Sequence, residues 1–450
     1  MLGVLAKLAP MRANPNPPSG EYLTAREAVQ WLDVQRQTLY AYVSRGLIRS
    51  VIRPGQKARL YLRADVERVH ARALARAGHG AVAADAMNHG QAIISTSITE
   101  ITPQGPRYRG RLATELVDEA ASFEAVAELL WRGQWEPQAP VWPVAATPRM
   151  LVGMVEALRD AAGRDSLLEV FALVVLQLGL QRRAPRNAQE SVHDHAREIL
   201  QVLVGCCGLA SRDPHYVPMV RGERIADALL RALGGEPSPS NRAAIGLMLT
   251  LLADHELMPG TLAVRVAASS GATLHACIAA ALCSSSGMNV AHLYDDAHAF
   301  LGGGGKAALL RRALERHASG RPLPGFGHAL YPQGDPRGRV LLAFMRSHYP
   351  QRPLLAVCEA IEEIERATGL RVRHELPMVA LTRAMGLGQE AASAIFVVAR
   401  VAGWVAHIEE QRRSGQLMRP RARFVTPVAH DSASPIAPRT VPNAGLNNQS

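Results

Sequence analysis

Helical periodicity dominates the middle of this 450-residue chain. Apolar residues recur at helical spacing, with short breaks, through residues 148–162, 165–181, 187–208, 222–234 and 240–257. Hydrophobic residues make up 48% of the chain and aromatic residues only 5%, and the helix-forming alanine and leucine dominate the hydrophobic set. We therefore predict an all-α protein whose length suffices for one large domain and one small domain, or for two or three of ordinary size.

Positive charge is concentrated at the start of the chain. The whole sequence carries a net charge of +11, and residues 1–80 hold 13 Lys or Arg residues against 5 Asp or Glu residues, a net charge of +8. A small segment with this excess is the electrostatic footprint of a protein that binds a polyanion, and the remaining 370 residues are close to balanced.

The same basic segment has the order of elements of a winged helix-turn-helix. Thr24-Ala25-Arg26-Glu27 is a capping box that begins a helix, and a second helix is predicted from Gln35 to Ser44. Two short strands, at 47–52 and 59–62, surround a Pro54-Gly55 turn, and a helix follows from Asp65 to Ala75. Residues 20–76 resemble the MerR/excisionase type of this module.

DNA binding is the function we favour for this module over a docking domain with a solvated basic face. Side chains of the kind that contact bases or phosphates from a helix in the major groove, or from a wing, are present. The candidate DNA contacts are Arg36, Gln37, Tyr40, Arg45, Lys57 and Arg59.

The rest of the chain divides by composition. We predict a disordered tail over 1–19, a Gly/Ala-rich linker over 77–92, a helical domain over 93–423 and a second disordered tail over 424–450. The beginning of the chain lacks a usual cleavage site, and the apolar stretch Leu167 to Leu180 is too short to span a bilayer, so we expect a buried core helix there and no membrane role. Five cysteines without a C-x-x-C pattern favour buried free thiols, no metal site and the cytoplasm.

A loop at residues 324–337 carries the first indication of chemistry. It contains three glycines and three prolines, which fix a non-repetitive backbone between two helical patterns. His328 can exchange a proton near neutral pH, and Arg337 can form a forked contact with a carboxylate. The loop is therefore predicted to bind a small anionic substrate.

Further polar residues stand in unusual settings. His255 lies between two acidic residues at the end of an apolar helix, and Arg400 lies in a long helix with apolar neighbours on both sides. An arginine in such a helix requires an anion. Arg419, Arg421 and Arg423 form another basic cluster just before the C-terminal tail.

Residues 93–424 resemble a citrate synthase. The motifs that carry the resemblance are Tyr108-Arg109-Gly110, Ser122-Phe123-Glu124 with Leu129-Leu130-Trp131, Asp254-His255-Glu256-Leu257, Gly325-Phe326-Gly327-His328 with Asp335-Pro336-Arg337, Arg400 with Gly403-Trp404-Val405-Ala406-His407, and Arg419-Pro420-Arg421. The resemblance implies an all-α homodimer whose large and small domains close over oxaloacetate and acetyl-CoA. It also implies an oxaloacetate site formed by His255, His328, Arg337, Arg400 and an arginine of the other subunit matching Arg419.

Two positions depart from what the resemblance implies. In the family a histidine of a Gly-Pro-Leu-His-Gly-Gly motif hydrogen-bonds the thioester oxygen, and counting without gaps from His255 puts Val290 there. His292 could replace that histidine if the turn shifts by two residues. The family's catalytic aspartate corresponds to Glu375, which is one methylene longer.

The sequence therefore predicts a citrate synthase-type acyltransferase that condenses acetyl-CoA or propionyl-CoA with oxaloacetate, as in the tricarboxylic acid cycle. In this prediction His328 polarises the ketone, Glu375 is the base, acyl-CoA is a substrate, and no cofactor is tightly bound. Two alternatives remain: a DNA-binding regulator whose synthase domain senses oxaloacetate, citrate or a CoA ester, and a non-catalytic subunit that forms a heterodimer with an intact synthase.

Overall fold

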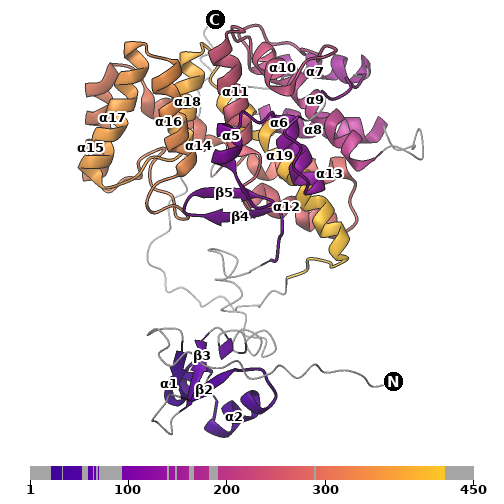
Figure 1. The fold of residues 1–450 in the computed structure, drawn as a ribbon. Coiled ribbons are helices and arrows are strands. Elements are labelled where there is room, and N and C mark those ends of the chain that lie inside the picture. The colour runs from indigo at the N-terminus through magenta and orange to yellow at the C-terminus, as the bar shows by residue number, and fades with distance from the viewer. Residues whose placement is uncertain are drawn as a thin grey trace, which may run out of the picture. The chain divides into compact units, whose positions relative to one another are not determined.

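The computed structural model describes residues 22–32, 34–52, 59–63, 65–66, 69, 94–138, 141–146, 149–161, 167–181, 191–287 and 290–420. The chain divides into two compact units, one formed by Met1–Ile94 with Pro420–Ser450 and the other by Ser95–Arg419 (Figure 1). The tails predicted over 1–19 and 424–450 and the linker predicted over 77–92 lie outside the described residues.

The first unit contains a small sheet and two short helices. Its elements are β1 (Tyr22–Thr24), α1 (Ala25–Leu32), α2 (Arg36–Ser44), β2 (Ser50–Ile52) and β3 (Arg59–Leu62). The strands are antiparallel in the order β1-β3-β2, with Leu23 opposite Tyr61. The predicted capping box is present, because the Thr24 and Glu27 side chains each accept a hydrogen bond from the other residue's backbone N–H. Leu39 and Tyr61 are fully buried and hold α2 against the sheet.

Most of the candidate DNA contacts lie on the surface of this unit. Arg36, Gln37 and Tyr40 are exposed on α2, Arg45 is exposed directly after it, and Arg59 is exposed at the start of β3. Lys57 and most of the helix predicted over 65–75 lie outside the described residues.

The second unit is predominantly helical. It begins with a small antiparallel sheet of β4 (Thr99–Thr102), β5 (Gly105–Tyr108) and β6 (Arg111–Leu112), which contains the hairpin expected around residues 103–105. The helices that follow are α5 (Ala113–Asp118), α6 (Phe123–Arg132), α7 (Arg149–Ala161), α8 (Leu167–Gln181), α9 (Val192–Cys206), the 3-10 helix η2 (Cys207–Ala210), α10 (Ile225–Ala232), α11 (Pro239–Leu252), α12 (Pro259–Ser269), α13 (Leu274–Ser285), α14 (His292–Leu301), α15 (Gly305–Ala318), α16 (Pro336–His348), α17 (Arg352–Thr368), α18 (Glu375–Ala384) and α19 (Ala391–Ser414).

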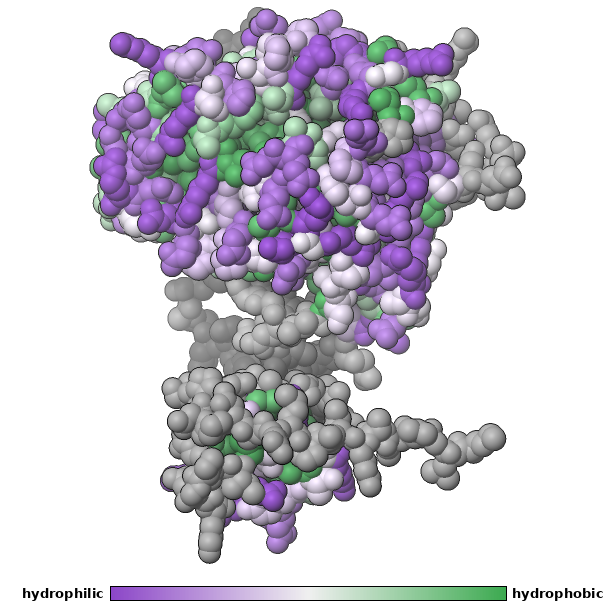
Figure 2. Space-filling model, viewed as in Figure 1, coloured by the Kyte–Doolittle hydropathy of each residue, from purple (hydrophilic) through white to green (hydrophobic). Residues whose placement is uncertain are grey.

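Helices α14–α18 form a lobe of their own beside the remaining helices of this unit (Figure 1). We call it the α14–α18 lobe. Within it α15 packs on α17, and α18 packs on α14 and α16. On the face drawn in Figure 2, hydrophobic residues gather where this lobe adjoins α11, and hydrophilic residues cover most of the rest of the unit.

Helix α19 is the central helix of the unit. It packs against α6, α9, α11, α12, α13 and α18. Its length and apolar composition would suit a membrane span, but its 18-residue apolar window is 100% buried among these helices. Its chemistry-bearing side chains therefore lie in the protein interior.

Helix α8 corrects one expectation. The stretch is predicted to be a buried core helix, and Phe171, Val174 and Val175 are buried. Leu173, Leu176 and Leu180 are instead 50%, 42% and 52% exposed, which leaves an apolar stripe along the outer side of the helix. The high hydrophobicity of α8 thus reflects two apolar faces, of which the described residues cover one.

Candidate active site

The loop at 324–337 is held against the segment that precedes α18. The Gly327 N–H donates to the Arg371 carbonyl at 2.8 Å, and the Arg373 N–H donates to the Gly325 carbonyl at 2.8 Å. Gly325 has φ +75°, and a Cβ added there would lie 2.5 Å from the Leu376 Cβ. This close approach requires glycine, and it brings the His328 loop next to the start of α18.

His328 lies in a cluster with His255 and Tyr331. The ring centroids of the two histidines are 5.8 Å apart, and His255 Nε2 is 3.0 Å from the Tyr331 hydroxyl. The Leu330 N–H donates to His328 Nδ1 at 3.1 Å, which leaves the ring proton on Nε2 when the histidine is neutral. Burial and the nearby Arg337 guanidinium lower the pKa of His328 to about 4, so it is a neutral hydrogen-bond donor at pH 7.

Arg337 is held in a fixed orientation by Asp335. Asp335 caps α16 by accepting from the Arg337 N–H, and its two oxygens accept from Arg337 Nε and Nη2 at 3.0 and 2.9 Å. Burial alone would raise the pKa of Asp335, but Arg337 and His374 hold it well below its usual value. Among the described residues, the buried Nη1 of Arg337 has no hydrogen-bond partner.

Arg400 has even fewer partners. It lies in the middle of α19 and is 1% exposed, yet none of its three guanidinium nitrogens has a hydrogen-bond partner among the described residues. The nearest opposite charge is Asp254 Oδ1, 3.9 Å from Nη1, and the Phe396 ring centroid lies 5.1 Å from Cζ. Burial lowers the pKa of Arg400, but its guanidinium remains charged at neutral pH. A buried cation in this state requires an anionic ligand.

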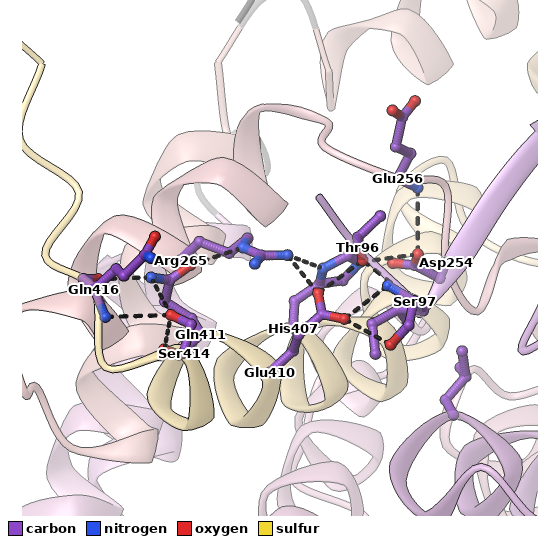
Figure 3. A network of polar contacts seen from close by, with 12 residues as sticks. Thr96, Ser97, Asp254, Glu256, Arg265, His407, Glu410, Gln411, Ser414 and Gln416 are labelled. Atoms are coloured by element: carbon purple, nitrogen blue, oxygen red, sulfur yellow. Dashed lines mark hydrogen bonds and ion pairs between the residues drawn. The ribbon is translucent and has the colours of Figure 1, made fainter. Parts of the chain in front are cut away.

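A polar network holds Asp254 in place (Figure 3). His407 Nε2 is 3.1 Å from Asp254 Oδ2, while His407 Nδ1 lies 3.3 Å from Arg265 Nη1. Because the arginine can only donate, Nδ1 is the acceptor and Nε2–H donates to Asp254. Gly403 allows the helix to approach, since a Cβ there would lie 2.2 Å from Asp254 Oδ1.

The network continues from Arg265 to the sheet side of the unit. Arg265 Nη1 donates to Glu410 Oε2 at 2.7 Å, and Glu410 accepts from the Thr96 hydroxyl and from both the N–H and the hydroxyl of Ser97 (Figure 3). Burial would raise the pKa of Glu410, but these donors lower it to about 2. The network therefore keeps two carboxylates ionised and fixes α19 relative to the turn between α11 and α12.

The predicted base, Glu375, begins α18 and is 3% exposed. Both of its oxygens accept from Arg373, from Nε at 3.1 Å and in a short contact from Nη2. Burial would raise the pKa of Glu375, but His374 and Arg373 hold it below its usual value. The carboxylate is thus ionised at neutral pH and able to accept a proton, although the Arg373 pair reduces its basicity.

Val290 lies close to Arg400. It is buried and, with Phe396, Trp404 and Arg400, lines a cavity of about 10 Å³, which is the volume of about one water molecule. The position that lacks the expected histidine therefore borders the cluster, and its side chain has no hydrogen-bonding group.

Two other candidate residues lie apart from this cluster. His292 begins α14, forms an ion pair with Asp295 at 3.3 Å and lines a different cavity with Glu169 and Glu390. Arg419 is exposed after the end of α19. The structure thus brings together His255, His328, Arg337, Arg400 and Glu375, and it does not bring His292 or the same chain's Arg419 into their hydrogen bonds or ion pairs.

Sequence reasoning missed several polar residues of the site. Asp254, Asp335 and His407 stood inside motifs that were recognised, and Arg373 stands two residues before Glu375, so their charge was a usable signal. Tyr294 and Tyr331 carried none, because a tyrosine in a helix or loop is ordinary until its hydroxyl partner is known.

Comparisons with known proteins find similarity over most of the chain. A family model described as "Citrate synthase, C-terminal domain" matches residues 87–421. The 2-methylcitrate synthase of Shewanella oneidensis is 26% identical over 376 residues, which cover 78% of this chain and 96% of that protein.

Two solved structures share the fold. The citrate synthase of Thermotoga maritima has a TM-score of 0.62 at 20% identity and covers 77% of this chain and 96% of its own. A ternary complex of carboxymethyl coenzyme A and oxaloacetate with citrate synthase from the archaeon Thermoplasma acidophilum has a TM-score of 0.64 at 21% identity, with 77% and 97% covered.

Proposed function

Since this chain belongs to the citrate synthase family, we propose that it condenses an acyl-CoA, either acetyl-CoA or propionyl-CoA, with oxaloacetate. The observation that carries the proposal is the pair of buried arginines, Arg337 and Arg400, whose unpartnered nitrogens lie near two histidines. Two guanidinium groups and two imidazoles suit a ligand with two carboxylates and a ketone.

Oxaloacetate binding follows from the donors that are left over in the cluster. Arg400 offers all its guanidinium nitrogens and Arg337 offers Nη1, and each can accept a carboxylate oxygen in a charge-assisted hydrogen bond. The Nε2–H of neutral His328 would donate to the ketone oxygen and make the ketone carbon more electrophilic. His255 is also kept neutral, because burial and the two arginines lower its pKa well below the usual value.

Glu375 would take a proton from the α-carbon of the acyl group, and the resulting enolate carbon would attack the ketone carbon. Water then hydrolyses the thioester of the condensed product and releases the CoA thiol. The ionised state of Glu375 supports its role as the base, and its position at the first turn of α18, next to the His328 loop, brings it to the same site.

A second copy of the chain would complete the site. The apolar stripe of Leu173, Leu176 and Leu180 on α8 supports a dimer contact, because a stripe of this size on an outer helix is normally covered. Arg419 follows α19 and is exposed, so it is available to a second copy. We propose that it adds a third arginine to the partner's oxaloacetate site.

The test is release of free thiol from acetyl-CoA or propionyl-CoA when oxaloacetate is added to the purified full chain. We expect release that requires oxaloacetate and disappears in Glu375→Gln, which keeps the size of the side chain and removes the base. Absence of release from either acyl-CoA, with oxaloacetate still raising the melting temperature, would contradict the enzyme function and favour a sensor.

That sensor is the second candidate, and two observations favour it. Val290 cannot supply the donor expected at its position, and the first unit carries exposed Arg36, Gln37 and Tyr40 on one helix. A DNA-binding regulator that responds to a bound dicarboxylate would account for both observations: a synthase domain that lacks a catalytic donor, and a first unit with side chains that suit DNA. Arg36→Ala should weaken binding of duplex DNA at low salt, whereas Arg26→Ala, an exposed change on α1, should not. Equal affinity of both variants and wild type would argue for a docking domain.

A further inference from the structure

The first turn of α14 carries a buried tyrosine, Tyr294, close to position 290, where the expected hydrogen-bond donor to the thioester oxygen is missing. Val290 precedes α14, and the Leu293 and Tyr294 N–H groups donate to the carbonyls of Val290 and Ala291, so the backbone is already turning as a helix. Positions 290 and 294 are therefore one helical turn apart and lie on the same side. Both meet Phe396: Val290 lines a cavity with it, and the Tyr294 ring centroid is 5.5 Å from it.

The Tyr294 hydroxyl is the last member of a buried chain of polar groups. His374 Nδ1 is 3.1 Å from Asp335 Oδ2, and His374 Nε2 is 3.3 Å from the Tyr294 hydroxyl oxygen. Because Asp335 is ionised and can only accept, His374 carries its proton on Nδ1, and Nε2 is free to accept. Burial and the nearby Arg337 guanidinium lower the pKa of His374, which favours the neutral ring that this role requires.

The same chain of groups touches the base. His374 Nδ1 is also 3.5 Å from Glu375 Oε2, so the tyrosine hydroxyl and the base carboxylate flank one imidazole. Tyr294, His374 and Glu375 are each less than 7% exposed. The hydroxyl and the base carboxylate therefore belong to one buried polar cluster, from which both can reach the same small group.

We propose that the Tyr294 hydroxyl donates the hydrogen bond to the thioester oxygen of the acyl-CoA, in place of the histidine that position 290 lacks. This inference rests on the proposed condensation and deepens it, because it names the residue that stabilises the enolate. Tyr294 is then a catalytic residue, and His374 is a positioning residue that acts through it.

In the proposed step, Glu375 removes a proton from the α-carbon, and the electrons of that C–H bond form the carbon–carbon double bond of the enolate. The carbonyl electron pair moves to the thioester oxygen, which accepts the hydrogen bond from Tyr294. The double-bond pair then forms the bond to the ketone carbon, and the thioester carbonyl is restored. Attack on the ketone carbon turns the ketone oxygen into an alkoxide, which takes a proton from His328 Nε2–H. Solvent then returns a proton to His328, and Glu375 releases to solvent the proton that it took from the α-carbon.

The setting of Tyr294 suits a donor. Burial and the nearby Glu375 carboxylate raise the pKa of the phenol well above its usual value, so it keeps its proton at neutral pH. Its hydrogen bond to His374 is at the long end of the range, and the hydroxyl hydrogen can rotate to a stronger acceptor. An oxygen that gains negative charge is such an acceptor.

Binding of carboxymethyl-CoA tests the inference without turnover. The carboxylate of this analogue lies one bond further from sulfur than the thioester carbonyl does, and it presents an anionic oxygen close to where the enolate oxygen would form. In saturating oxaloacetate, Tyr294→Phe should weaken carboxymethyl-CoA binding by roughly 10- to 100-fold, the loss expected for one hydrogen bond to a charged group. Oxaloacetate affinity should not change. The matched control is Tyr349→Phe, since that buried hydroxyl bonds Asn241 at 2.6 Å and lies outside the cluster's hydrogen bonds.

Turnover provides the second readout. Tyr294→Phe should lower kcat by about 10²- to 10³-fold with little change in the KM for oxaloacetate, and adding Val290→His should restore part of it. If wild type releases no thiol, the proposed condensation is wrong. Weaker binding of carboxymethyl-CoA to Tyr294→Phe than to wild type would even then support the Tyr294 hydroxyl as the hydrogen-bond donor to the acyl group. If Tyr294→Phe binds the analogue as tightly as wild type does, the inference is overturned whatever the turnover.

Discussion

Arg400 and Arg337 are equally buried but differ in their partners, and this difference predicts opposite effects of the same substitution. Each is 1% exposed. Arg337 forms a two-pronged pair with Asp335, whereas none of the guanidinium nitrogens of Arg400 has a hydrogen-bond partner among the described residues. Replacing either with methionine removes the charge and keeps most of the volume.

Without ligand, Arg337→Met should lower the free energy of unfolding by about 3–5 kcal/mol, because it leaves the buried Asp335 carboxylate without its main partner. Arg400→Met should change it by no more than about 1 kcal/mol or raise it. It removes a buried cation whose only ion pair among the described residues is 3.9 Å long, and His407 still holds Asp254.

With oxaloacetate bound, Arg400→Met should be less stable than wild type, because the substitution removes a cation that binds the ligand. Wild type at a ligand concentration of 100 Kd should gain about 2.7 kcal/mol of stability. Loss of a buried charge pair with the ligand costs about 2–5 kcal/mol, so Arg400→Met should bind oxaloacetate roughly 10²- to 10³-fold more weakly and gain less than about 0.5 kcal/mol of stability at the same concentration.

Melting temperature measured with and without oxaloacetate, together with titration calorimetry, separates these effects. A ligand-free Arg400→Met protein that melts as early as Arg337→Met would refute the assignment of Arg400 to ligand binding. It would show that Arg400 stabilises the fold itself.

Three further predictions follow from the surroundings of the site. Arg373→Gln should move the acid limb of the pH profile of kcat/KM to higher pH. In the wild type, burial raises the pKa of Glu375, but His374 and Arg373 outweigh burial and hold this pKa below its usual value. An acid limb that stays at the same pH in Arg373→Gln would exclude Glu375 as the base. Glu410→Gln should lower the free energy of unfolding at pH 7 by no more than about 3 kcal/mol. The pKa of Glu410 is about 2 in the folded protein and near 4.3 in the unfolded chain, so the ionised carboxylate contributes its full stabilisation above about pH 4.3. Melting curves should show the stability difference between wild type and Glu410→Gln becoming smaller as the pH falls from about 5 toward 2. A difference that stays constant over this range would contradict an ionised Glu410 in the folded protein. Gly325→Ala should raise the KM for oxaloacetate and lower the melting temperature, because φ is +75° and Leu376 leaves no room for a Cβ; unchanged kinetics would mean that the loop adapts freely.

Local sequence patterns located several elements of the fold. The segments predicted at 165–181 and 187–208 correspond to α8 and α9, and in α6 the Ser122 side chain caps the beginning of the helix and the left-handed Gly133 ends it. These signals work because capping and apolar spacing act within a few residues of one another. The outer face of α8 was misjudged, because hydrophobicity alone does not tell whether a second surface is covered by the same chain.

The sequence by itself also predicted an anion site, from Arg400 in an apolar helix and from His328 and Arg337 in the loop at 324–337. Only the tertiary structure decided which groups remain unpaired. Asp254 meets His407 across 153 positions, and Tyr294 meets His374 across 80. Helical periodicity fixes which side of each helix is buried, but contacts between polar groups so far apart depend on the crossing of packed helices. The pairing of Arg337 with Asp335 is therefore a property of the fold, and so is the lack of a hydrogen-bond partner for the Arg400 guanidinium among the described residues. Both arginines can nevertheless be recognised in the sequence.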